Sequence, residues 1–239
     1  MIDLHCHFLP GIDDGPETMD ESLALARMAV DNGIEMAVLT PHIHHGRYDN
    51  NFYSIYGKFE EFKKKLEQYQ IPLKINMAAE VRLSEEILPM FGRAHIPFLG
   101  KHEGYKIMLL EFPHSHIPVG GDKLVKHLLS LGIKPLIAHP ERNKAVMKNI
   151  EKIIPFLDMG CMLQLTSRSL TGGFGEKCKV SAEEMLLNGW VSVLATDAHN
   201  TTHRPPHLAE GRDAVEVLLG EEAALDLVKG APSRILGGW

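Results

Sequence analysis

The side chains in this sequence that could bind metal ions stand directly after short apolar runs. His5 and His7 are two residues apart, so on an extended chain both point the same way and can share an ion. Asp197 and His199 repeat this spacing near the other end of the chain. Further imidazoles and carboxylates follow other apolar runs or lie in a turn: Asp14, His42, Glu80, Glu111 and His139. Zinc takes about four ligands and manganese or iron about six, so these nine candidates predict two or three ions.

Two arginines follow these candidates by a few residues. Arg142 stands three residues after His139, and Arg204 lies shortly after the pair Asp197 and His199. A planar guanidinium can bind two phosphate oxygens at once, which makes both arginines candidate phosphate ligands. Two ions about 4 Å apart can activate a bridging water and hold both oxygens of an in-line phosphoryl displacement. Taken singly, each residue also fits a salt bridge or a helix cap. Their shared position after apolar runs favours a metal-dependent phosphoesterase.

The apolar runs themselves predict the strands that must position this chemistry. They are short and largely unalternating, as expected for a parallel sheet buried on both faces. We expect strands at Ile2–Leu4, Met36–Thr40, Leu73–Ala79, Lys106–Leu110, Lys134–Ala138, Met162–Leu165 and Val191–Ala195. In a parallel barrel the carboxyl ends of the strands meet at one face, where active sites of that architecture lie.

Helical patterns occupy the segments between these runs. The clearest covers Met19 to Asn32, where Thr18 and Glu21 form a capping box and Gly33 can end the helix. Other helices are expected at Phe52–Tyr69, Gly121–Leu131, Ile150–Met159, Ser181–Asn188 and Pro206–Leu219. Seven strand–helix units favour a distorted (β/α)7 barrel of the TIM-like α/β class. The alternative is an open doubly wound sheet, whose nucleotide-binding form is weakened because no Gly-rich phosphate loop follows any strand.

Composition narrows the class of protein further. The 239 residues are 44% hydrophobic and 23% charged, with a net charge of −6 and 14 histidines. Mean hydropathy is −0.09, and no apolar run approaches the ~20 residues of a membrane span. No lysine–arginine block suggests nucleic-acid binding. Candidate site residues begin at Asp3, which leaves no room for a cleaved leader. We therefore expect a cytoplasmic protein with one domain over residues 1–239.

Cysteine chemistry is a rival route to phosphate hydrolysis, but the spacing is wrong for it. A cysteine phosphatase needs Cys-x5-Arg, and six residues beyond Cys6, Cys161 and Cys178 stand Ile12, Ser167 and Glu184. Three cysteines with no CxxC pair also argue against a disulfide scaffold or a zinc finger.

Taken together, the motifs resemble those of the PHP superfamily. Within it, they are similar to the manganese-dependent bacterial protein-tyrosine phosphatases of capsule and exopolysaccharide operons, the CpsB/YwqE type. The resemblance covers nearly the whole chain. Its segments are Met1-Ile2-Asp3-Leu4-His5-Cys6-His7, Asp13-Asp14-Gly15, Thr40-Pro41-His42, Glu80, Glu111-Phe112, Ile137-Ala138-His139-Pro140-Glu141-Arg142 and Thr196-Asp197-Ala198-His199.

The resemblance implies a (β/α)7 barrel with three divalent metal ions, of which manganese is the expected identity and iron or zinc the alternatives. By correspondence of motifs, the first ion takes His5, His7, Glu80 and Asp197. The second takes Glu80, Glu111 and His139, and the third takes Asp14, His42 and His199. Arg142 and Arg204 match the arginines that hold the substrate phosphate. Catalytic roles are expected for Arg142, Arg204, His42 and Asp197.

The implied substrate is phosphotyrosine in the C-terminal tail of a bacterial tyrosine kinase that controls polysaccharide export, attacked by a metal-bridging hydroxide. The main alternative is a PHP-fold phosphoesterase of small phosphomonoesters, similar to histidinol-phosphatase. A nuclease is disfavoured by the acidic net charge. An amidohydrolase is disfavoured because it often bridges its metals with a carboxylated lysine, where this chain has Glu80. The intact ligand set disfavours a catalytically silent kinase-binding module. Oligomeric state and the roles of His44, His45, His114 and His116 stay open.

Overall fold

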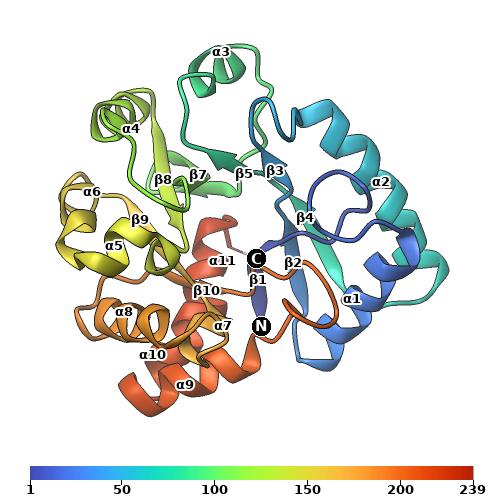
Figure 1. Cartoon of the computed structure of the whole chain (residues 1–239). Coiled ribbons are helices and arrows are strands. Elements are labelled where there is room, and N and C mark those ends of the chain that lie inside the picture. The colour runs from blue at the N-terminus through green and yellow to red at the C-terminus, as the bar shows by residue number, and fades with distance from the viewer. Residues whose placement is uncertain (239) are drawn as a thin grey trace.

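Parallel strands surround a central axis, and helices cover the outside of the barrel they form (Figure 1). The computed structural model describes residues 1–238. Its strands are β1 (Ile2–Cys6), β2 (Met36–Leu39), β3 (His42–Ile43), β4 (Lys74–Met77), β5 (Glu80–Arg82), β6 (Gly100–His102), β7 (Tyr105–Glu111), β8 (Ile133–Ala138), β9 (Met162–Thr166) and β10 (Val193–Ala195). All pairings between these strands are parallel except that of β6, which runs antiparallel to β7.

Hydrogen bonds close these strands into a barrel. Pairing runs β1-β2-β4 in one part and β10-β9-β8-β7-β5-β3 in the other. β3 continues the course of β2 after Pro41, and β5 continues that of β4. Between β10 and β1, the Asp197 N–H donates to the His5 carbonyl and the His7 N–H donates to the Ala198 carbonyl, both at 2.8 Å. The predicted (β/α)7 barrel is confirmed, with breaks in its second and third strands.

The two ends of the barrel differ in chemistry. At the amino ends of the strands, Ile2, Met36 and Ile107 join an apolar cluster with Ala231 and Ile235 of α11 (Ala231–Ile235). All members of this cluster are apolar, so it adds no buried polar group to this end of the barrel. Polar side chains gather instead at the carboxyl ends of the strands. The sequence pattern therefore separates a stabilising end of the barrel from an end that can carry chemistry.

Helices connect most of the successive strands. The longest are α1 (Met19–Asp31), α2 (Phe52–Gln68), α4 (Gly121–Ser130), α8 (Glu176–Leu187) and α9 (Ala209–Leu219). The predicted capping box of α1 is present, with the Thr18 hydroxyl accepting from the Glu21 N–H and the Glu21 carboxylate accepting from the Thr18 N–H. Among residues 1–238, no helix is both long enough and apolar enough to cross a membrane.

Several elements differ from the sequence-based prediction. α8 begins at Glu176, five residues before the expected start, and Ile150–Met159 divides into the 3₁₀ turn η2 (Ile150–Ile153) and α6 (Ile154–Asp158). The pattern also failed to indicate β6 and the short helices. These are α3 (Ile87–Gly92), η1 (Pro140–Arg142), α5 (Lys144–Lys148), α7 (Ser167–Leu170), α10 (Glu221–Leu225), the π-helical turn η3 (Asp226–Gly230) and α11. All of them have six residues or fewer, too short to show an amphipathic period.

Candidate metal centre

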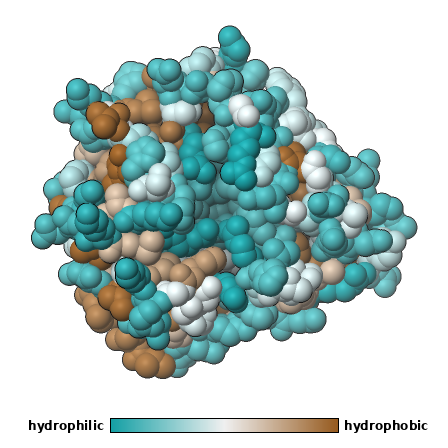
Figure 2. All heavy atoms as spheres, in the orientation of Figure 1, coloured by the Kyte–Doolittle hydropathy of each residue, from teal (hydrophilic) through white to brown (hydrophobic). Residues whose placement is uncertain are grey.

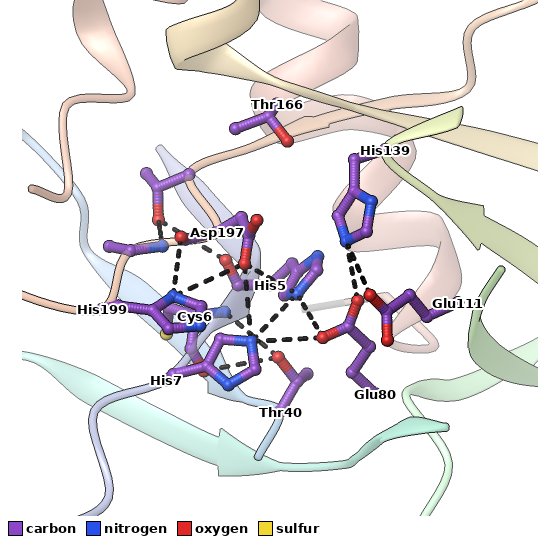
Figure 3. Close-up of polar contacts among 12 residues, drawn as sticks. His5, Cys6, His7, Thr40, Glu80, Glu111, His139, Thr166, Asp197 and His199 are labelled. Atoms are coloured by element: carbon purple, nitrogen blue, oxygen red, sulfur yellow. Dashed lines mark hydrogen bonds and ion pairs between the residues drawn. The ribbon is translucent and has the colours of Figure 1, made fainter. Parts of the chain in front are cut away.

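The nine predicted ligands lie close together at the carboxyl ends of the strands. Figure 3 shows this convergence for all of them except Asp14 and His42. His5 lies on β1, His42 on β3, Glu80 on β5 and Glu111 on β7. The remaining candidates stand in the connections that follow strands: His7, Asp14, His139, Asp197 and His199. Figure 2 shows that this face is hollowed over the barrel and that hydrophilic residues line the hollow.

Four of these side chains form the inner group: His5, His7, Glu80 and Asp197. The His5 Nε2 atom lies 3.3 Å from Glu80 Oε2 and 3.2 Å from Asp197 Oδ1. The two imidazoles face each other, with 3.2 Å between their Nε2 atoms. All four side chains are at most 1% exposed. One potential ligand atom from each converges on a single buried point.

A second cluster, the outer group, joins Asp14, His42 and His199 to His7. Asp14 Oδ1 lies 3.2 Å from His42 Nε2 and 3.4 Å from His199 Nε2. The Asp14 side chain is 39% exposed, in the loop that follows β1. This cluster holds the three residues expected for the third ion and opens toward solvent.

The third cluster joins Glu111 to His42 of the outer group and Glu80 of the inner group. His42 Nδ1 lies 2.9 Å from Glu80 Oε2, and both residues group with Glu111. His139, which was expected beside Glu80 and Glu111, places its Nε2 atom 2.8 Å from Glu80 Oε1 and 4.0 Å from Glu111 Oε1. Glu80 thus belongs to the inner group and to the third cluster and contacts His42 of the outer group, a position that suits a bridging carboxylate.

Buried ligand atoms without well-aligned hydrogen bonds show that the centre fits cations. Glu80 Oε2, Glu111 Oε2, Asp197 Oδ1 and His199 Nε2 are all buried and form no well-aligned hydrogen bond. Each has only an ion-pair contact: Glu111 Oε2 lies 2.9 Å from an Arg82 guanidinium nitrogen, and Glu80 Oε2 lies 2.9 Å from His42 Nδ1. A buried carboxylate oxygen is costly unless a donor or a cation compensates it. Mixed imidazole and carboxylate donors suit manganese, iron and zinc, so the residues fit divalent ions of this kind.

The electrostatic field of the inner group also favours positive charge. Burial lowers the pKa of His5, but the carboxylates of Glu80 and Asp197 outweigh it and raise that pKa above its ordinary value. Burial likewise raises the pKa of Glu80, but the charges of His5 and His42 hold it well below the usual range. Burial lowers the pKa of both His139 and His199 to about 4, so each imidazole is neutral at pH 7, the form that binds metal.

A hydrogen bond on the side away from the inner group fixes each of the imidazoles of His5 and His7. His7 Nδ1 lies 2.7 Å from Asp13 Oδ2, and His5 Nδ1 lies 2.8 Å from Gln164 Oε1 on β9. Such partners orient the ring and leave its Nε2 atom facing the metal. These roles of Asp13 and Gln164 were not predicted from the sequence, although a glutamine inside the apolar run of β9 indicates a buried polar contact.

Two of the candidate ligands have backbone conformations that are uncommon for residues other than glycine. His139 has a φ of 34° and Asp197 a φ of 51°, in the left-handed region. Strain of this kind persists where the surrounding structure imposes it, and it clusters at functional sites. His139 directly follows β8, and Asp197 follows β10 after Thr196, so both left-handed residues stand where the chain turns at the carboxyl end of a strand.

The two predicted phosphate ligands meet at the edge of the centre. Arg142 Nη1 and Arg204 Nη2 both donate to Asp197 Oδ2, the carboxylate whose other oxygen belongs to the inner group. Phe174 packs on the Arg142 guanidinium, with 4.4 Å from the ring centre to Cζ. Phosphate binding by these arginines stays a prediction, but the structure does bring the two heads together.

The residues expected to be structural or unassigned lie outside these clusters. Glu141 is buried and accepts hydrogen bonds from the Thr166 N–H at 3.0 Å and the Ser169 hydroxyl at 2.6 Å. His45, His114, His116 and His203 are exposed, and His44 is half-buried. Burial raises the pKa of every thiol: Cys6 well above its ordinary value, Cys161 to about 12 and Cys178 to about 11. The thiols are therefore protonated, which agrees with the rejection of cysteine chemistry.

Comparison with known proteins supports the same class of centre. The chain is 32% identical over 231 residues to the tyrosine-protein phosphatase YwqE of Bacillus subtilis, covering 97% of this chain and 90% of that protein. It is 30% identical over 245 residues to the tyrosine-protein phosphatase CpsB of Streptococcus pneumoniae, covering 99% and 98%.

Solved structures give the same relationship. A structure reported for YwqE and CpsB, described as unique metal-dependent tyrosine phosphatases, superposes with a TM-score of 0.91 at 31% identity, covering 100% of this chain and 96% of that one. A mutant organophosphorus hydrolase from Deinococcus radiodurans shares only the fold, with a TM-score of 0.61 at 15% identity over 99% of this chain and 92% of its own. The family described as capsular polysaccharide synthesis, CpsB/CapC, matches residues 1–237, and the chain belongs to it.

Proposed function

We propose that this chain is a metal-dependent protein-tyrosine phosphatase. The observation that carries the proposal is the meeting of buried candidate ligand atoms, which form no well-aligned hydrogen bond, with two guanidinium groups at Asp197. Membership of the CpsB/CapC family and the named activity of its relatives support it. Divalent ions bound here would lower the pKa of water, supply a hydroxide nucleophile at neutral pH and neutralise phosphate charge.

The residues of the chain divide the remaining work. We assign three ions to the sets derived from the family motifs, with Glu80 shared between the first two and manganese as the expected metal. Arg142 and Arg204 hold the phosphate oxygens and stabilise the charge that develops during displacement. Asp197 orients both guanidinium heads through one oxygen. His42 links the outer group to Glu80, because its two ring nitrogens face Asp14 and Glu80. Tyrosinate, whose conjugate acid has a pKa near ~10, leaves without a dedicated acid side chain.

We propose that this enzyme is cytoplasmic and that its substrate is phosphotyrosine in the C-terminal tail of a bacterial tyrosine kinase that controls capsule or exopolysaccharide synthesis. The capsular role in the family description supports this context. The test is metal analysis of the purified protein together with hydrolysis of a phosphotyrosyl tail peptide. We expect bound transition metal and turnover that exceeds turnover of histidinol phosphate. Equal or faster turnover of the small phosphomonoester would reassign the enzyme to that class.

A further inference from the structure

A groove lies on the outside of the barrel between α5 and α8, which pack side by side on the left of Figure 1. Its volume is about 540 Å³. The residues that line this α5–α8 groove are Lys144, Met147, Lys148, Glu176, Lys177 and Val180. It is separate from the metal centre, whose ligands come from the strand ends on the barrel axis.

Three lysines give the groove an excess of positive charge. Lys144, Lys148 and Lys177 form no ion pair with any carboxylate in residues 1–238, whereas Lys179, farther along α8, pairs with Glu183 at 3.7 Å. Glu176 is the one acidic residue in the lining. The chain as a whole carries a net charge of −6, so this concentration of unpaired cations runs against its composition. Such a patch attracts an anionic ligand.

Both walls of the groove begin at the proposed phosphate site. Arg142 ends η1, and α5 starts two residues later at Lys144, whose N–H donates to the His114 carbonyl at 2.9 Å. On the other wall, Phe174 packs on the Arg142 guanidinium two residues before α8 begins. Burial lowers the pKa of His114, and the positive charges of Lys144 and Arg142 add to that shift. Positive potential thus extends from the phosphate site into the groove.

The floor of the groove suits a peptide chain. Met147 and Val180 supply apolar contact between the lysines, and the Val180 side chain is 50% exposed. Methionine adapts its shape to varied partners. An extended chain advances about 3.3–3.6 Å per residue, so a few residues reach from Arg142 along α5. A polypeptide with its phosphate at the metal centre can therefore lay its neighbouring residues in this groove.

We propose that the α5–α8 groove docks an acidic segment adjacent to the phosphotyrosine of the protein substrate. The proposal rests on the phosphatase function proposed above and specifies which protein substrates the enzyme prefers. Aspartate or glutamate side chains of the segment pair with Lys144, Lys148 and Lys177. The backbone of the segment covers Met147 and Val180.

The test compares two triple variants of the whole metal-loaded enzyme. The groove variant carries Lys144→Gln, Lys148→Gln and Lys177→Gln. The control variant carries the same change at Lys63, Lys64 and Lys65 of α2, on the opposite side of the barrel (Figure 1). Substrates are a phosphotyrosyl peptide with flanking aspartates and glutamates, the same peptide with asparagines and glutamines, and p-nitrophenyl phosphate.

We expect the groove variant to raise KM for the acidic peptide about tenfold at unchanged kcat, since each exposed ion pair contributes about 1.4- to 5-fold. The neutral peptide and p-nitrophenyl phosphate should change less than about twofold, and the control variant should match the wild type on all substrates. Salt should erase the wild-type preference for the acidic peptide because exposed pairs are screened.

Equal KM values for the acidic peptide in the two variants would overturn the docking proposal while leaving the phosphatase intact. If the groove variant instead lost binding to anionic phospholipid vesicles without a change in peptide KM, the groove would belong to a membrane contact and the proposal would be wrong. A metal-loaded wild type that fails on p-nitrophenyl phosphate and both peptides would contradict the phosphatase function itself.

Discussion

The inner and outer groups of the metal centre use similar ligands but differ in how firmly the protein holds them. The inner side chains are at most 1% exposed, and Gln164 and Asp13 anchor the two imidazoles from behind. In the outer group, Asp14 is 39% exposed in a loop and contacts the ligands His42 and His199 themselves.

We infer from this difference that the candidate metal centre has a rigid inner part and a more adjustable outer part. Buried ligands whose imidazoles have hydrogen-bond partners behind them are held in the binding geometry before an ion arrives, so less ordering opposes binding. A loop carboxylate must be ordered by the ion that it binds. We therefore expect tight metal at the inner group and weaker, more exchangeable metal at the outer group.

The largest effect should follow loss of an inner ligand. His5→Ala removes a candidate ligand that lies between Glu80 and Asp197. We therefore expect kcat/KM to fall by more than the ~10–100-fold that loss of a ligand's hydrogen-bond partner costs. Elemental analysis should also show a lower metal-to-protein ratio. Asp14→Ala should keep the inner metal and lose only the outer one. Equal metal loss in the two variants would break the comparison between the groups.

Metal removal tests the same gradation without mutation. A chelator at increasing concentration should first remove the outer metal and then abolish activity, and added manganese should restore turnover. The readouts are metal content and hydrolysis of a phosphotyrosyl peptide at each step. Full activity in a verified metal-free preparation would rule out the proposed chemistry altogether.

The next largest effect concerns the arginines that contact the inner group from outside. Arg142→Ala and Arg204→Ala should each lower kcat/KM by roughly 10²–10³-fold, the loss of about 3–4 kcal/mol seen when one transition-state donor is removed. Metal content should stay at the wild-type level. Lysine at either position should rescue only partly, because an ammonium lacks the planar fork. Alanine variants with normal turnover would show that these are surface arginines.

A smaller effect should follow loss of the side chains that hydrogen-bond to His7 and His5 from behind. Asp13→Asn and Gln164→Leu leave every ligand in place but loosen His7 and His5, so metal affinity should weaken by ~10–100-fold. Titration of the metal-free protein with manganese measures this change. Asp158→Asn, an exposed aspartate at the end of α6, serves as the control and should bind metal normally. Unchanged affinity in Asp13→Asn and Gln164→Leu would show that burial alone holds the inner group.

Strands and ligand positions could be predicted from sequence because both have local causes. A buried parallel strand is an apolar run, and a candidate ligand is the polar residue at its carboxyl end, as Glu111 is the last residue of β7. The start of α8 was missed because its first turn is polar and Gly175, with a φ of 90°, sets the boundary. β3 has two residues and β5 three, too few for a pattern to show where Pro41 interrupts the sheet.

The hydrogen-bond partners of His5 and His7 could not be predicted because these contacts do not depend on the local sequence. Gln164 orients His5 across 159 positions of the sequence, and the choice between Asp13 and Asp14 depends on how the turn is folded. The convergence of Arg142 and Arg204 on one carboxylate oxygen also needs the ends of two strands, β8 and β10, in place. Residue types and their spacing indicated the candidate ligands, whereas the hydrogen bonds that orient them depend on closure of the barrel.

The smallest effect is expected at Cys6, which stands between His5 and His7 in sequence but packs on the other side of β1. It is fully buried in the apolar cluster, and its thiol donates to the Val38 carbonyl at 3.5 Å. Because burial raises the pKa of this thiol well above its ordinary value, no thiolate is present to attack phosphorus. Cys6→Ser should therefore keep kcat/KM within about threefold and lower stability by ~1 kcal/mol, the scale of one buried hydrogen bond. Peptide assays and thermal unfolding measure the two quantities. A large loss of activity with metal retained, or a phosphorylated cysteine trapped during turnover, would place the thiol in the chemistry and remove the metal centre from it.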